Sequence, residues 1–170
     1  FGNLCQRVCA FVIRNCDSKI PEKIQFKNDD LKILNEYTQN LDKIRSEIDN
    51  QNINYYIDYI VNRLFDANKY FNDQEPWKKK DDIIRLNTIV YTTLEIVRKI
   101  TYLLYPIIPH SSLKALDLFN LKEKDIIFET IKDNEFLKKG GDINKIDILF
   151  NKIERKNDWF TLPFRSWTII

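Results

Sequence analysis

Apolar residues recur every three or four positions along most of this chain, which is the spacing of helices that bury one face. The clearest example runs from Ile53 to Leu104, where two long stretches keep this spacing on either side of a polar break. Only three glycines and five prolines interrupt the 170 residues. The pattern therefore predicts an all-α fold, an antiparallel bundle of about five helices with short connections.

Capping residues and prolines predict where these helices begin and end. The expected helices cover residues 2–16, Asn28 to about Asp49, Asn52 or Asn54 to about Asn72, Asp81–Asp82 to just before Pro106, and about Pro109 to Phe119. Pro21 opposes any continuation of the first helix, since proline lacks the backbone N–H that a helix needs.

The pattern changes after Asn120. Leu121 to Leu137 could carry a short helix or a turn, and Ile146, Ile148 and Phe150 alternate as in a short extended strand. We therefore divide the chain into a helical domain (1–120), an extension leading out of the bundle (121–154) and a tail (155–170). The tail either packs through its four aromatic side chains or is a non-native extension.

Composition limits the classes of function. The length fits one domain with a full hydrophobic core. A net charge of +2 is too small for the whole surface to attract nucleic acid, so any RNA contact must come from a local patch. No apolar run approaches the ~20 residues of a membrane span, and no secretory leader precedes the first helix. The chain begins without methionine, and we interpret it as a piece of a longer protein.

Catalytic and metal-binding constellations are not expected. His110 is the single histidine, and its place after a proline is typical of a helix start. Cys5, Cys9 and Cys16 lie close to one apolar helical stripe without a Cys-x-x-Cys pair, which favours small buried hydrophobes in a reduced protein. The three glycines cannot form a phosphate-binding loop.

One tryptophan follows a helix-ending proline and precedes three lysines. This segment reads Asn72-Asp73-Gln74-Glu75-Pro76-Trp77-Lys78-Lys79-Lys80. Because Pro76 stops the helix, Trp77 has no obvious core to enter, and its indole is well placed to stack on a nucleic-acid base. The alternative from this segment alone is that Trp77 folds back over the end of the bundle.

The first helix carries a second candidate pair. Asn3 and Arg7 are four residues apart, so their side chains lie one above the other on the polar face. An amide beside a five-donor guanidinium can read a base edge or hold a phosphate, although most polar helix faces are simply solvated.

Four segments keep the order and spacing of one known family. They are Phe1–Arg7 (Phe-Gly-Asn-Leu-Cys-Gln-Arg), Ala67–Trp77 (Ala-Asn-Lys-Tyr-Phe-Asn-Asp-Gln-Glu-Pro-Trp), Leu103–Pro109 and Ile148–Glu154. Together they resemble the anticodon-binding domain of methionyl-tRNA synthetase, whose discriminating pattern is Asn-x-Tyr followed by Pro-Trp. Asn151 replaces the proline of the family's Leu-Phe-Pro-Arg-Ile-Glu. The resemblance covers residues 1–154, and we find none from Arg155 onward.

The resemblance implies recognition of the CAU anticodon of tRNA-Met, initiator and elongator alike, with neither DNA nor a membrane as a partner. It implies that Trp77 stacks on an unstacked anticodon base while Asn3 and Arg7 hydrogen-bond to base edges. The phosphate-contact candidates are Lys78, which fits the family pattern, and Lys79, Lys80 and Arg14, which rest on charge.

The resemblance also implies a parent enzyme that attaches methionine to tRNA with ATP in the cytoplasm. The family's His-Ile-Gly-His and Lys-Met-Ser-Lys-Ser signatures are missing here, and the chain has no methionine. We therefore expect no catalytic residue and no cofactor on this chain, which alone should be inactive. ATP, and zinc, would belong to the catalytic half of the same polypeptide.

Two other readings remain open from the residues. An anticodon domain of another class I synthetase would keep the helices and change the base readers, although the Pro76-Trp77 pair argues against it. A non-enzymatic protein-interaction bundle would bury Trp77 against a partner helix and leave Asn3 and Arg7 without a role.

Overall fold

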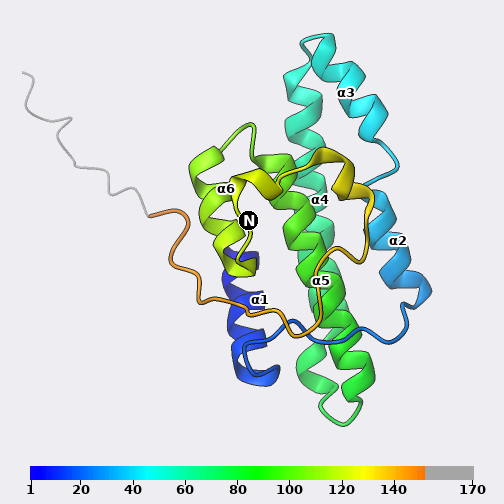
Figure 1. Cartoon of the computed structure of the whole chain (residues 1–170). Coiled ribbons are helices and arrows are strands. Elements are labelled where there is room, and N and C mark those ends of the chain that lie inside the picture. Colours follow the sequence, from blue (N-terminus) through cyan, green and yellow to red (C-terminus); the bar gives the residue numbers. More distant parts are fainter. Residues whose placement is uncertain (152–170) are drawn as a thin grey trace, which may run out of the picture.

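The computed structural model describes residues 1–151, most of which are helical (Figure 1). The α-helices are α1 (Gly2–Asn15), α2 (Asn28–Glu36), α3 (Leu41–Asp49), α4 (Ile53–Gln74), α5 (Ile83–Leu104) and α6 (Pro109–Leu116). Short 3-10 turns are η1 (Pro76–Lys78), η2 (Asp117–Phe119), η3 (Glu123–Asp125) and η4 (Phe128–Lys132). No strand occurs in residues 1–151, and the predicted all-α bundle is confirmed. The tail predicted for 155–170 lies outside the described residues.

Helix α5 is the centre of the bundle. It contacts α1, α2, α4 and α6, and Figure 1 shows it running antiparallel to α4. All but three of its 22 residues are buried, so that every side of this helix, including its polar residues, faces the interior of the protein. Its buried threonine hydroxyls donate to carbonyls one turn earlier at 2.7 to 2.9 Å, so they enter the core without losing a hydrogen bond.

Two predicted helix starts are confirmed by their caps. The Asn52 side chain accepts a hydrogen bond from the Tyr55 N–H at 3.4 Å, and α4 begins at the next residue. The Asp82 carboxylate accepts from the Arg85 N–H at 2.9 Å at the start of α5. Each side chain satisfies a backbone donor that has no partner within its helix, which is why the sequence signal was reliable here.

The single helix predicted from Asn28 to Asp49 is wrong, because α2 ends at Glu36 and α3 begins at Leu41. Tyr37 is completely buried at the break, and its hydroxyl donates to the Arg63 carbonyl of α4 at 2.7 Å. Helix α2 can therefore pack against α4 and α5, while α3 turns away to pack against the N-terminal part of α4. The break is caused by this tertiary contact of Tyr37, which the apolar spacing along the chain does not reveal.

The strand predicted at Ile146, Ile148 and Phe150 is also wrong. Ile148 and Phe150 are exposed, whereas Ile143, Ile146 and Leu149 point inward at a spacing of three. This stretch has no neighbouring strand to supply a hydrogen-bonded ladder. It crosses the bundle as irregular chain, bonded at its start to residues 18 and 118.

Buried charges on α5 attach the segment after α6 to the bundle. Glu95, Arg98 and Lys99 are fully buried, and the Arg98 Nε donates to Glu95 at 2.8 Å. Within α5, Glu95 also accepts a hydrogen bond from the Tyr91 hydroxyl, at 3.3 Å. Beyond α5, the partners of these charged groups are the carbonyls of Thr130, Ile131 and Asp133, the Asn134 side chain and the Leu137 N–H. Burial, and after it the charge of Arg98, lower the pKa of Lys99 to about 8. Because unpaired buried charges are costly, these bonds hold segment 130–137 against α5.

A second buried ion pair, between Asp30 of α2 and Arg85 of α5, also holds the end of α4 against the start of α5. The Arg85 guanidinium donates to both carboxylate oxygens of Asp30, at 2.5 and 3.0 Å, and to the Gln74 side chain at 2.6 Å. The Tyr70 hydroxyl also donates to Asp30, at 2.5 Å. Burial alone would raise the pKa of Asp30, but the hydrogen bonds from Arg85 and Tyr70 outweigh it and hold the pKa below its usual value. The network fixes both ends of the turn that carries Trp77.

We expect Asp30→Asn to lower the free energy of unfolding by about 3 kcal/mol, because it leaves the Arg85 charge buried without a counter-charge. Urea unfolding followed by circular dichroism measures this change. The neighbouring exposed Asp29→Asn is the control and should change stability by no more than about 0.5 kcal/mol. The folded pKa of Asp30 lies below its unfolded value, so its contribution is present above the unfolded pKa and lost as pH falls through the folded pKa. The gap between the variant and the wild type should therefore narrow in acid, and equal stabilities at neutral pH would contradict the assignment.

Candidate nucleic-acid interface

Trp77 lies in a sharp turn after α4. Glu75 has φ 44° and ψ 58°, in the left-handed region, and ends the helix, while Pro76 is buried at the start of η1. Proline cannot continue the hydrogen-bonded ladder of α4, so the chain turns here and points the next side chain outward. The indole of Trp77 is 40% exposed, so it is neither enclosed in the core nor free of it.

Phe71 supports this indole from the last turns of α4. Its ring is only 2% exposed and makes edge-to-face contacts with Trp77, with centroids 6.0 Å apart, and with Phe11 of α1, at 5.9 Å. The Arg7 guanidinium lies over the same ring, 5.5 Å from its centroid, and its Nη2 donates to the Asn72 side-chain oxygen at 2.7 Å. Arg7 of α1 and Trp77, seventy residues later in the chain, therefore meet at one phenylalanine.

The apolar stripe of α1 decides which face of this helix is turned toward the bundle. Leu4, Cys5, Val8, Cys9 and Val12 are buried, and α1 packs against α5. The opposite face carries Asn3, Arg7 and Arg14, together with the exposed Ala10 and Ile13.

An open groove of about 560 Å³ lies between α1 and η1, and we call it the α1–η1 groove. Its lining consists of Arg7, Ala10, Phe11, Arg14, Asn15, Phe71, Trp77 and Lys80. Three of these described residues are cationic and none is acidic, although the chain as a whole is nearly neutral. The groove combines an exposed aromatic face, a fixed guanidinium and positive charge, which are the groups that a single-stranded nucleic acid uses.

The sequence candidates do not all lie in this groove. Arg7, Trp77, Arg14 and Lys80 line it, whereas Asn3 is exposed one turn before Arg7 and outside the lining. Lys78 forms an ion pair with Glu75 at 2.8 Å, and Lys79 is half-buried outside the groove. Phe71 and Asn72 support Arg7 and belong to the Ala67–Trp77 motif, but the sequence analysis assigned them no function. Their position shortly before the helix-ending Pro76 could have indicated that they lie next to Trp77.

A second, larger groove of about 730 Å³ is less suited to an anionic ligand. It lies where α2 and α5 begin, and its lining includes Lys27 and Arg85 but also Asp29 and Asp82. Its guanidinium is already bonded to Asp30 and Gln74. Because its charges are mixed and its arginine is already bonded to Asp30 and Gln74, we assign this groove a structural role and not a role in binding an anion.

The described residues carry no group of three or more His, Cys, Asp or Glu side chains placed to hold a metal ion. All three cysteines are free, and burial raises the pKa of the Cys5 thiol to about 12, which keeps it in the unreactive neutral form. Over the described part of the chain, none of the helices combines the length and the apolar character of a membrane span.

Comparisons with known proteins agree with this picture. The family model of the anticodon binding domain of methionyl-tRNA ligase matches residues 20–162, a range that includes 155–162, which the sequence motifs had left outside the resemblance. The methionine–tRNA ligase of Mycobacterium leprae is 35% identical over 136 residues, covering 77% of this chain and 25% of that protein. That of Rickettsia felis is 32% identical over 157 residues, covering 90% of this chain and 31% of that protein.

Solved structures show the same fold. The apo form of Mycobacterium tuberculosis methionyl-tRNA synthetase superposes with a TM-score of 0.82 at 29% identity, covering 89% of this chain and 31% of that chain. This chain thus spans between a quarter and a third of the length of these three relatives. The match of the family model over most of its length shows that the chain belongs to the family of methionyl-tRNA ligase anticodon-binding domains.

Proposed function

We propose that the α1–η1 groove binds the CAU anticodon loop of methionine tRNAs, initiator and elongator alike. The observation that carries the proposal is the meeting of Trp77 and Arg7 at Phe71, in a groove lined by three cations and no acid. Sequence-specific recognition of RNA favours unpaired loops, whose bases can stack on aromatic side chains and expose their Watson–Crick edges.

Each side chain then has a distinct task. Trp77 offers its exposed face to an unstacked base. Arg7 donates to the acceptors on a base edge, for which cytosine supplies O2 and N3, and Asn3 reaches a neighbouring base from the turn above. Arg14 and Lys80 neutralise phosphates and add affinity without specificity. The ion pair between Lys78 and Glu75 leaves Lys78 less free for this task.

The whole protein, by the same proposal, is an ATP-dependent methionine–tRNA ligase that acts in the cytoplasm. ATP binding, zinc and the chemistry of methionine transfer would belong to the part of its relatives that this chain does not cover. Free, buried thiols at Cys5 and Cys9 support a reducing compartment.

Trp77→Ala should weaken binding of a CAU stem-loop RNA by ~1–3 kcal/mol, the range for loss of one base–aromatic stack. Fluorescence anisotropy with a labelled stem-loop measures the dissociation constant. Trp77→Phe should retain much of the affinity, because it keeps an aromatic face. The matched control is Phe65→Ala, which removes a 70% exposed aromatic ring from α4 outside the groove lining. An unchanged affinity in Trp77→Ala would overturn the proposal.

Arg7→Ala should reduce discrimination between CAU and a stem-loop with one changed anticodon base. The lost contact costs ~1–3 kcal/mol with the correct base and less with the wrong one, so the ratio of the two dissociation constants should fall. Arg45→Ala is the matched control, since Arg45 lies over the Phe128 ring at 5.7 Å on a different part of the bundle. A ratio that falls equally in both variants would argue against a reading role.

Lys80→Ala should weaken binding to all stem-loops alike and reduce the slope of log affinity against log salt by about 0.7, the value for one phosphate contact on a single strand. Lys79→Ala should change this slope less, because Lys79 lies outside the groove lining. Titrations of both variants over a range of potassium chloride concentrations compare the slopes. A larger change of slope in Lys79→Ala than in Lys80→Ala would contradict this assignment and would place the phosphate contact at Lys79.

A further inference from the structure

Phe71 touches Trp77 and Arg7, two of the proposed RNA-contacting residues, from within the core. Trp77 meets its ring edge-to-face at an interplanar angle of 72°, and the Arg7 guanidinium lies over the ring. Its third contact, with Phe11 at 89°, closes the ring on the side of α1. Phe71 borders the groove, but with only 2% of its surface exposed it offers almost no surface of its own to RNA.

From these contacts we infer that Phe71 is a positioning residue that couples the stacking of a base on Trp77 to the reading of a base by Arg7. The inference rests on the proposed function of the groove. It adds that the two residues bind RNA as one unit rather than as independent contacts.

The geometry of Arg7 explains one half of the coupling. Its guanidinium is held by the ring face of Phe71 and by the side-chain oxygen of Asn72. Phe71 and Asn72 are consecutive residues near the end of α4. A ring attracts a cation through its negative face, so the cation follows any change in the tilt of that ring. One Arg7 donor is used by Asn72, and the other N–H groups remain for a ligand.

The geometry of Trp77 explains the other half. An edge-to-face pair is favourable only over a limited range of angles, so a base that shifts the indole also shifts Phe71. Pro76, which is buried at the start of η1, precedes Trp77 and holds its backbone, so such a shift is taken up by the side-chain contact. Removal of either Trp77 or Arg7 therefore weakens the placement of the other.

A double-mutant cycle on the 170-residue chain tests this coupling directly. The dissociation constants for a CAU stem-loop are compared among the wild type, Arg7→Ala, Trp77→Ala and the double variant. We expect the loss in the double variant to fall short of the product of the single losses by at least about threefold. In a Phe71→Leu background the shortfall should disappear, with single losses that multiply within about twofold.

The outcomes separate the two proposals. If neither single substitution weakens binding, the proposed function fails and the coupling fails with it. If both weaken binding and their effects multiply in the otherwise unchanged chain, only the coupling is overturned. This first cycle needs no Phe71 variant, so it can overturn the coupling even if Phe71→Leu folds poorly, whereas the assignment of the coupling to Phe71 depends on the second cycle.

A second measurement separates positioning from a general loss of stability. Trp159→Phe with Trp167→Phe makes Trp77 the single tryptophan of the chain, so that its emission and its quenching by acrylamide report on its surroundings. In that background Phe71→Leu should increase quenching and reduce anticodon discrimination at least about threefold. The control Phe119→Leu removes another buried phenylalanine, 6% exposed, and should lower thermal stability without changing either readout. Equal behaviour of the two variants would assign Phe71 a purely structural role.

Discussion

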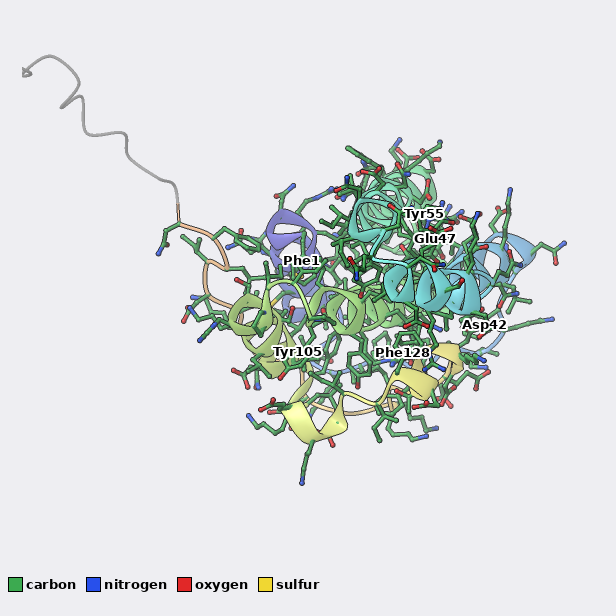
Figure 2. All side chains as sticks on the ribbon, turned by 90° about the horizontal axis from the view of Figure 1, so that it is seen from above. Phe1, Asp42, Glu47, Tyr55, Tyr105 and Phe128 are labelled. Atoms are coloured by element: carbon green, nitrogen blue, oxygen red, sulfur yellow. The ribbon has the colours of Figure 1, made fainter. Side chains whose placement is uncertain are left out.

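The fold depends on the requirement that a helix buried on every side must find all its polar partners inside the protein. Helix α5 meets most of this requirement with threonines that bond to their own helix and with charged groups that bond to neighbouring segments, while the Nη1 of Arg98 is buried without a hydrogen bond and its guanidinium lies over the Phe136 ring. Each buried charge therefore specifies where its partner segment must lie, because moving that segment away would leave the buried charge unpaired. Figure 2 views the bundle from above, with Phe128 of η4 and Asp42 of α3 on the same side of it.

The same constraint reaches the candidate site through Arg85. This side chain sits at the start of α5, and its bonds to Asp30 and Gln74 draw α2 and the end of α4 against α5. The turn that carries Trp77 lies between Gln74 and Arg85 and is held at both of its ends. A groove made by side chains from two distant segments can then keep its shape before any ligand arrives, which lowers the ordering cost of binding.

The charge distribution fits recognition by a local patch. The net charge of +2 gives little general attraction to RNA, yet Arg7, Arg14 and Lys80 are gathered along the α1–η1 groove. Nearby acids are used elsewhere, for example Glu75 with Lys78 and Asp73 with Lys69. The cations of the groove therefore lie beside the exposed face of Trp77, so that one groove offers groups for both the phosphates and the bases of a single loop.

The sequence by itself determined the helical class, the start of α4 at Asn52 or Asn54, the start of α5 at Asp81–Asp82, the turn at Pro76 and the family resemblance. Each of these depends on residues close together in the chain, such as a cap, a proline or a three-and-four spacing. The motif also pointed to Arg7 and Trp77, which the structure brings together on Phe71.

Only the tertiary structure decided the features that depend on contacts between distant segments. The break between α2 and α3 follows from burial of Tyr37 against α4, and the inward spacing of three in 143–149 follows from packing on the bundle without a partner strand. The same holds for the site, where Lys80 and not Lys79 reaches the groove and where Phe71 and Asn72 support Arg7. Local pattern could not show these results, because side-chain direction and partner choice are set by packing between helices that lie far apart in sequence.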